Sequence, residues 1–351
     1  MPRPIHTGII GFGLSGRVFH APFIYTHPGF ELLAVVERHH RHAADTYPVV
    51  NILRSHRELL ENKDIELIVI TTPNTLHFPM AVECLEAGKH IVIEKPFTPT
   101  SAEADALIRL SEKTGKKIFV YQNRRWDGDF QTIKNLAENN VLGELRYYEA
   151  HFDRFSPEIK PGAWRNENIP GGGILFDLGS HLVDQALVLF GLPDSLIANV
   201  NIERAGAEVD DAFHIEMHYP GLKAIVTAGM LVEKAGPRYI VEGSLGKYSK
   251  FGIDPQEARL KAGEMPSANI GKEDPSYWGI IEPGQKTSFE PYKIPSHNGN
   301  YMAFYDGVFA SIRENAPMPV EPLEARNVIF IIEKAFESSK SGRTIKIKKT
   351  Q

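Results

Sequence analysis

The sequence predicts a two-domain α/β protein, with an N-terminal doubly wound parallel sheet and a C-terminal α+β domain whose sheet is mainly antiparallel. Over the first 123 residues, apolar β-rich runs alternate with helix-compatible stretches, as parallel sheets require. After residue 195, several strand-like runs follow one another without helices between them. A length of 351 residues also suits two domains. We therefore expect domains at residues 1–123 and 124–351.

Composition narrows the class of protein. Hydrophobic residues make up 42% and charged residues 24% of the chain, which is typical of globular domains. The net charge of −5 is spread along the sequence, so neither nucleic acid nor a membrane surface is an expected partner. Cys84 is the single cysteine, and no apolar run approaches a membrane span of about 20 residues. We expect a cytoplasmic protein with a small-molecule partner.

A glycine-rich stretch near the N-terminus predicts a dinucleotide site. It lies between an apolar β-rich run and a helix-compatible segment, where a strand would turn into a helix. Gly11 allows the tight turn, Gly13 lets a pyrophosphate approach the backbone, and Gly16 lets the helix lie against the strand. The residues expected to form this turn are Gly11, Gly13, Leu14, Ser15 and Gly16.

The next strand-like run ends in two residues with opposite implications. Glu37 lies about 20 residues beyond the glycines, where a carboxylate accepts hydrogen bonds from the ribose of NAD. Arg38 follows it, and a guanidinium there could stack on adenine or bind a 2′-phosphate. We expect a nicotinamide dinucleotide, leave its 2′-phosphate open, and lean towards NADP.

Polar residues follow the other strands of this half, and the carboxyl ends of parallel strands share one edge of the sheet. The cofactor-binding candidates among them are Thr72, Pro73, Asn74, His77, Glu94, Lys95 and Asn123. Lys95 could be a surface lysine paired with Glu94. Its place at a strand end favours a partly desolvated acid or base instead.

A second cluster lies in the C-terminal half. Spacings of four and three residues put Asp177, His181 and Asp184 on one side of a helix. A structural Asp–His pair is the alternative, and a metal site is conceivable but not required by the chemistry. The glycine triplet 171–173 would let a ligand approach the backbone. Candidates for shaping the substrate pocket, equally common in ordinary structure, are Arg154, Trp164 and Arg165.

The remaining segments carry weaker patterns. We expect a short helix at 54–61, a helix at 129–140, and amphipathic helices at 301–315 and 323–339. The Pro- and Gly-rich stretch 250–293 predicts irregular surface loops.

Together these motifs resemble the Gfo/Idh/MocA family of NAD(P)-dependent oxidoreductases. The matching pieces are Gly11 to Gly16, Thr72-Pro73-Asn74 with His77, Glu94-Lys95-Pro96, and the glycine triplet leading to Asp177, Gly179, His181 and Asp184. Three further stretches look most like the family's bacterial NADP-dependent scyllo-inositol dehydrogenase branch; they are residues 19–22, 121–127 and 181–185.

The resemblance implies a Rossmann domain, and a C-terminal domain with a large open sheet that mediates a homodimer or homotetramer. It also implies hydride transfer on a ring hydroxyl of a cyclic polyol or sugar. Lys95, Asp177 and His181 stand at the family's catalytic positions, and Asp184 at that of a substrate-contacting acid. Two alternatives stay open: a glycosidase that works by transient oxidation, and a dinucleotide sensor without catalysis.

Overall fold

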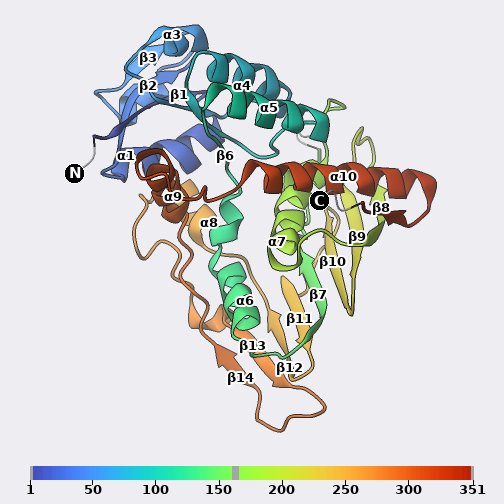
Figure 1. Cartoon of the computed structure of the whole chain (residues 1–351). Coiled ribbons are helices and arrows are strands. Elements are labelled where there is room, and N and C mark those ends of the chain that lie inside the picture. Colours follow the sequence, from blue (N-terminus) through green and yellow to red (C-terminus); the bar gives the residue numbers. More distant parts are fainter. Residues whose placement is uncertain (1–2, 160–165, 349–351) are drawn as a thin grey trace. The chain divides into compact units, whose positions relative to one another are not determined.

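The structure is a computed structural model that describes residues 3–159 and 166–348 (Figure 1). Its residues cluster into two compact units, each with its own sheet. Unit 1 contains residues 1–123, 256–270 and 300–326, and unit 2 contains residues 124–255, 271–299 and 327–351. The chain therefore passes from one unit to the other several times along its sequence.

Unit 1 is built on six parallel strands in the order β3-β2-β1-β4-β5-β6. They are β1 (Ile5–Ile10), β2 (Phe30–Val36), β3 (Asn51–Leu53), β4 (Leu67–Ile70), β5 (His90–Ile93) and β6 (Ile118–Val120). Strand order reverses between β1 and β4, which makes the switch point where such sheets bind ligands. Every residue of β4 is buried, as its unbroken apolar run predicts. The predicted doubly wound parallel sheet is confirmed.

The helices of unit 1 begin and end where local sequence dictates. They are α1 (Ala21–Thr26), α2 (His42–Thr46), α3 (His56–Glu61), α4 (His77–Glu86), α5 (Ser101–Thr114), α8 (Gln256–Lys261) and α9 (Met302–Arg313). Thr100 and Glu103 form a reciprocal capping box at the start of α5, and Gly115 ends it at a φ of 66°. The helix expected from residue 54 starts at His56 because Ser55 caps it.

Unit 2 contains a nine-stranded sheet in the order β14-β13-β12-β11-β7-β10-β9-β8-β15. Its strands are β7 (Leu145–His151), β8 (Ser195–Asn201), β9 (Ala212–Tyr219), β10 (Leu222–Gly229), β11 (Tyr239–Gly243), β12 (Gly246–Lys250), β13 (Gly279–Pro283), β14 (Tyr292–Ile294) and β15 (Ile345–Lys346). Strands β7 and β10 pair in parallel, and the other pairs described are antiparallel. The prediction of a mainly antiparallel sheet is confirmed.

Two helices of unit 2 contact this sheet, α7 (Ser180–Phe190) at a face and α10 (Pro322–Ser341) at the open side of strand β8. The helices of unit 2 are α6 (Gly128–Glu138), α7 and the later part of α10, whose first residues belong to unit 1. Phe190 of α7 packs against Tyr148 of β7 with ring centroids 5.4 Å apart. Ser338 of α10 accepts a hydrogen bond from the backbone N–H of Ala198 at 3.0 Å. Aromatic packing thus joins α7 to the sheet, and a hydrogen bond from a strand N–H joins α10 to it.

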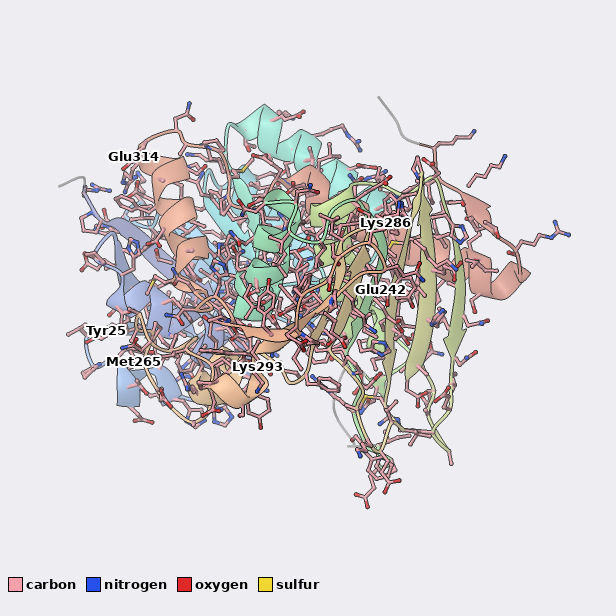
Figure 2. All side chains as sticks on the ribbon, turned by 90° about the horizontal axis from the view of Figure 1, so that it is seen from below. Tyr25, Glu242, Met265, Lys286, Lys293 and Glu314 are labelled. Carbon is pink, nitrogen blue, oxygen red and sulfur yellow. The ribbon has the colours of Figure 1, made fainter. Side chains whose placement is uncertain are left out.

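The other face of the sheet carries cross-strand charges. Lys223 Nζ of β10 lies 3.2 Å from Glu216 of β9, whereas the pair His151–Glu149, 2.8 Å apart, lies within β7. Lys247 pairs with Glu242 at 3.6 Å, and Glu242 is labelled on the sheet in Figure 2. Neighbouring strands therefore present opposite charges to each other on this face.

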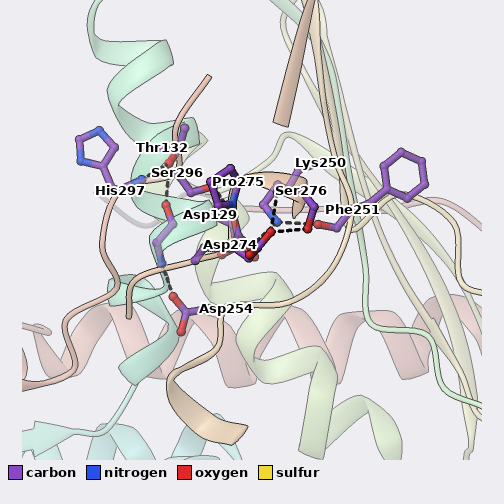
Figure 3. Close-up of polar contacts among 12 residues, drawn as sticks. Asp129, Thr132, Lys250, Phe251, Asp254, Asp274, Pro275, Ser276, Ser296 and His297 are labelled. Carbon is purple, nitrogen blue, oxygen red and sulfur yellow. Dashed lines mark hydrogen bonds and ion pairs between the residues drawn. The ribbon is translucent and has the colours of Figure 1, made fainter. Parts of the chain in front are cut away.

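The expectation of irregular loops at 250–293 is wrong for part of that stretch, which contains α8, β13 and β14. Short strands of mixed polarity leave no clear period, and pairing defines them: β13 pairs with β12, and β14 pairs with β13. Fully buried Lys250 donates to Glu273 at 2.7 Å and so fastens β12 to the segment that follows α8. Two hydrogen bonds attach later segments to the first two turns of α6 (Figure 3). The backbone N–H of Gly128 donates to Asp254 Oδ2 at 2.7 Å, and the backbone N–H of His297 donates to Thr132 Oγ1 at 2.8 Å.

Three further features bear on the kind of protein. Cys84 is buried in α4, and burial raises the pKa of its thiol to about 12, so it is a packing residue. No helix within the described ranges is both long enough and apolar enough to cross a membrane. Across the same residues, no group of three or more His, Cys, Asp or Glu side chains is arranged to hold a metal ion.

Candidate active site

The glycine turn after β1 has the geometry that a dinucleotide needs. Gly11 has a φ of 93°, which L side chains rarely adopt. A Cβ on Gly16 would lie 2.6 Å from the carbonyl oxygen of Gly11, so glycine is required for the helix to pack there. A Cβ on Gly13 would have no atom within 4 Å, and that open side is where a pyrophosphate would approach the backbone. The three glycines fit the group that the sequence predicts.

Beside this turn, Glu94 connects the glycine turn with the end of β5. Its Oε1 accepts hydrogen bonds from Ser15 Oγ and from His20 Nε2, the latter at 2.9 Å. Its Oε2 accepts from the backbone N–H of Lys95 at 3.0 Å. Burial alone would raise the pKa of the Glu94 carboxyl, but the bonds from His20 and Ser15 outweigh it and lower the pKa. Glu94 is therefore an ionised acceptor at neutral pH.

Glu37 points back towards its own loop. Its two carboxylate oxygens accept hydrogen bonds from the backbone N–H groups of His42 at 3.1 Å and Ala43 at 2.9 Å, at the start of α2. Glu37 is only 6% exposed, whereas Arg38 and the four residues after it are exposed. Arg54 Nη1 holds the loop by donating to the carbonyl oxygens of Glu37 and His40, both at 2.7 Å. The loop thus buries the acidic side chain of Glu37 and exposes the basic side chains that follow it.

His77 fastens two strand-end loops together. Its Nδ1 lies 2.9 Å from the carbonyl oxygen of Pro96, and its Nε2 lies 3.0 Å from that of Thr72. Burial lowers the pKa of His77, so the ring is neutral and donates to one carbonyl at a time. Asn74 and Asn123, which are also cofactor candidates, are buried near the ends of β4 and β6.

In unit 2, Asp177 and His181 lie on consecutive helical segments. Asp177 belongs to a π-helical turn, η5 (Leu175–Gly179), and His181 lies in the first turn of α7. Turns of this kind are often found at functional sites. His181 and Asp184 are buried, and Asp177 is half-buried. The predicted helix is present, but its first turn is wider than an α-helix.

Asp184 forms a buried ion pair that the sequence did not indicate. Arg125 Nε donates to Asp184 Oδ2 at 2.8 Å, and Arg125 Nη2 donates to Oδ1 at 2.7 Å. The two residues are 59 positions apart, so no local spacing links them. Substrate contact by Asp184 stays a prediction, and any such contact would have to share a carboxylate held by Arg125.

A cavity of about 260 Å³ in unit 2 brings together two of the predicted site residues, Asp177 and Arg154. Asp210, which the sequence analysis missed, also lines it. Burial raises the pKa of the Asp210 carboxyl to about 6. The further lining residues that bear on its polarity are Ser156, Glu158, Asn166 and Arg204.

Asp210 also explains part of the glycine triplet. A Cβ on Gly173 would lie 2.0 Å from Asp210 Oδ1, and one on Gly172 would lie 2.5 Å from the carbonyl oxygen of Glu167. The chain itself therefore fills the space that we expected a ligand to use. The carboxylate of Asp210 accepts from the backbone N–H of Leu175 at 2.8 Å, at the start of the turn that carries Asp177.

The predicted residues fall on both units. Lys95, half-buried after β5, belongs to unit 1, and Asp177, His181 and Asp184 belong to unit 2. Trp164 and Arg165, predicted to shape the substrate pocket, lie outside the described residues. The residues that sequence reasoning missed are His20, Arg125, Asp210 and Tyr305. A helical histidine and tyrosine carry no signal of their own, because both types are usual in cores.

Comparison with known proteins gives the same assignment for both parts of the chain. Residues 5–122 match the family model described as an oxidoreductase NAD-binding Rossmann fold, and residues 134–347 match that of the oxidoreductase C-terminal alpha/beta domain. The solved structure of the oxidoreductase yvaA from Bacillus subtilis superimposes with a TM-score of 0.94, at 38% identity and 99% coverage of both chains.

Curated relatives span nearly the whole chain. The scyllo-inositol 2-dehydrogenase (NADP(+)) IolW of Bacillus subtilis is 39% identical over 97% of this chain and 95% of its own. The uncharacterized oxidoreductase YdgJ of Escherichia coli is 39% identical over 98% of this chain and 99% of its own. The fold, the glycine turn and the matches to the two family models define an oxidoreductase with an NAD-binding Rossmann fold. The chain belongs to the Gfo/Idh/MocA family.

Proposed function

We propose that the protein is an NAD(P)-dependent dehydrogenase that acts on a ring hydroxyl of a cyclic polyol or sugar resembling scyllo-inositol. Residues 1–123 would bind the dinucleotide, and residues 124–351 would bind the substrate and form a homodimer or homotetramer. The observation that carries the proposal is the glycine turn with an open side at Gly13, beside the strand end that presents Lys95. The 39% identity to IolW supports the substrate class.

The loop after β2 favours NADP. In an NAD site, a carboxylate at the position of Glu37 would face the ribose hydroxyls. Here that carboxylate is buried and bonded to the start of α2, which offsets its charge. Arg38 is exposed on the same loop and supplies a planar guanidinium suited to a 2′-phosphate. IolW, by its name, uses NADP(+).

The cavity of unit 2 favours a neutral polyol over a phosphorylated or acidic sugar. Its lining includes three carboxylates, from Glu158, Asp177 and Asp210, and two arginines. One arginine, Arg204, already donates to Asp211 at 2.9 Å. Hydroxyl groups can donate to carboxylates, whereas a phosphate would be repelled by them.

In the proposed mechanism, the turn of Gly11, Gly13 and Gly16 would hold NAD(P)⁺, which would supply an acceptor for the hydride of the reacting carbon. His181 takes the hydroxyl proton at an imidazole nitrogen as the C=O bond forms. Lys95 Nζ donates a hydrogen bond to the same oxygen and stabilises the negative charge that develops there. Asp177, one turn before His181, orients the imidazole and keeps it basic.

The proposal is tested by mixing the purified protein with NADP⁺ or NAD⁺ and a panel of substrates, and following nicotinamide reduction by absorbance. The panel holds inositol isomers, aldoses, D-glucosides and one sugar phosphate; the D-glucosides are included because D-glucoside 3-dehydrogenase of Escherichia coli is 28% identical over 54% of this chain. Reduction with scyllo-inositol and NADP⁺ is expected. Dinucleotide binding without reduction of any member would contradict the dehydrogenase assignment and favour the glycosidase or sensor alternative.

A further inference from the structure

Unit 1 contains a buried chain of hydrogen bonds that the proposed mechanism does not use. The hydroxyl of Tyr305, in α9, lies 2.6 Å from His20 Nδ1, and His20 Nε2 lies 2.9 Å from Glu94 Oε1. Tyr305 and His20 are both 0% exposed. Tyr305 and His20 are 285 positions apart in the sequence, yet both belong to the same compact unit.

The donor and acceptor of each hydrogen bond between Tyr305, His20 and Glu94 can be assigned. Glu94 is ionised and only accepts, so His20 Nε2 must carry a hydrogen. Within the described residues, the hydroxyl of Tyr305 has His20 Nδ1 as its hydrogen-bond partner, so the buried O–H is satisfied only by donating there. In this arrangement His20 accepts from Tyr305 at Nδ1 and donates to Glu94 at Nε2.

This series of hydrogen bonds ends at Tyr305 in the core and does not lead to solvent. Tyr305 packs against Phe23, Phe30 and Phe304 with ring centroids 6.1, 5.6 and 5.4 Å apart. A proton-transfer path needs an exit at both ends, and this one is closed by aromatic rings at one end. Its effect is to fix one orientation of the Glu94 carboxylate, because each donor has a single acceptor.

We propose that His20 and Tyr305 are positioning residues for the dinucleotide site and act through Glu94. Glu94 accepts from Ser15 in the glycine turn and from the backbone N–H of Lys95 at the end of β5. Holding this carboxylate in place therefore holds the pyrophosphate-binding turn in register with the strand end that presents Lys95. Outer partners of this kind commonly tune the groups that bind a ligand.

The inference rests on the proposed function only in requiring that the chain bind a dinucleotide. Tyr305→Phe keeps the ring and removes the O–H that fixes the tautomer of His20. We expect the dissociation constant for NADPH, measured by fluorescence titration, to rise about three- to tenfold, as the loss of one net hydrogen bond predicts. The KM for the polyol should change less than the dissociation constant for NADPH, because only Lys95 among its proposed contacts lies beside Glu94, and Asp177, His181 and Asp184 are in unit 2.

A matched control separates positioning from general stability. Val308 lies three residues after Tyr305 on α9 and is fully buried, but its side chain makes no hydrogen bond. Val308→Ala should lower the melting temperature while the dissociation constant for NADPH stays at the wild-type value. Equal weakening by Val308→Ala and Tyr305→Phe would overturn the inference, because stability would then explain both.

A double-mutant cycle tests the connection itself. Ser15→Ala removes the hydrogen bond at the opposite end of this series, and Ser15 is linked with Tyr305 through the bonds of Glu94 and His20. If the residues act as one network, the double variant with Ser15→Ala and Tyr305→Phe should bind NADPH with nearly the same affinity as the single variant that binds it more weakly. Additive losses, or unchanged binding by Tyr305→Phe, would overturn the inference alone. Failure of the wild-type protein to bind NADPH or NADP⁺ would overturn the proposed function and the inference together.

Discussion

Arg125 holds Asp184 through two parallel hydrogen bonds of 2.7 and 2.8 Å, with both side chains largely removed from solvent. A planar guanidinium matches a carboxylate in this geometry, and neither charge would be tolerated in that place without the other. Asp184 lies in α7 one turn after His181, so the pair also bears on the helix that carries the proposed base.

Breaking this pair should destabilise the protein strongly. Arg125→Ala leaves a buried carboxylate without its partner, and we expect the free energy of unfolding to fall by about 3–5 kcal/mol. Chemical denaturation measures the change. Lys134→Ala is the control, because the pair Lys134–Glu138 is exposed on α6 and should cost less than about 0.5 kcal/mol. Similar losses in the two variants would mean that the bidentate pair has no special weight.

Turnover should depend on Lys95. Lys95→Ala removes the donor proposed to stabilise the charge on the reacting oxygen, and we expect kcat to fall by about two to four orders of magnitude. Titration with NADPH should still show binding, since the glycine turn is unchanged. A variant with near-normal turnover would remove Lys95 from the mechanism.

Cofactor choice should depend on Arg38. Arg38→Ala removes the charge proposed to bind the 2′-phosphate, so KM for NADP⁺ should rise about 10- to 100-fold. KM for NAD⁺, which lacks that phosphate, serves as the internal control and should change little. If both constants rise together, Arg38 contacts a part common to the two cofactors, such as adenine.

Two glycines with equal room for a side chain should behave differently. A Cβ would meet nothing within 4 Å at Gly13 or at Gly236, and neither has a positive φ. Gly13→Ala and Gly236→Ala should therefore both fold with nearly wild-type melting temperatures. Gly13→Ala alone should weaken NADPH binding, because its methyl group occupies the pyrophosphate side of the turn. Unimpaired binding by Gly13→Ala would contradict the assignment of that open side.

Asp210 should make stability depend on pH. Its pKa is raised from 3.8 to about 6 in the folded protein, so its ionisation opposes folding. The contribution of the protonated Asp210 carboxyl to the free energy of unfolding is fully present below pH 4. It is lost as the pH rises through 6, which lowers that free energy by about 2–3 kcal/mol. The difference in unfolding free energy between wild type and Asp210→Asn, measured from pH 4 to 8, should fall over that window and be flat above pH 7. A difference that does not vary with pH would show that the carboxyl is not destabilised by burial.

Much of the fold follows from local pattern. Unbroken apolar runs such as β4 predicted a parallel sheet, and the order of strands and helices predicted the doubly wound topology. The spacing of Gly11, Gly13 and Gly16 predicted a dinucleotide turn because each position has a separate backbone requirement. These features depend on residues that are close in sequence, so local pattern was enough to predict them.

The partners of the site's charged side chains depend on tertiary contacts. Glu37 could have faced a ribose, and the return of its loop onto α2 turned it inward. Asp184 is paired with a residue 59 positions away, and His20 with one 285 positions away. Sequence spacing predicts which face of an element a side chain occupies, but its partner depends on which distant elements the packed core brings against that face.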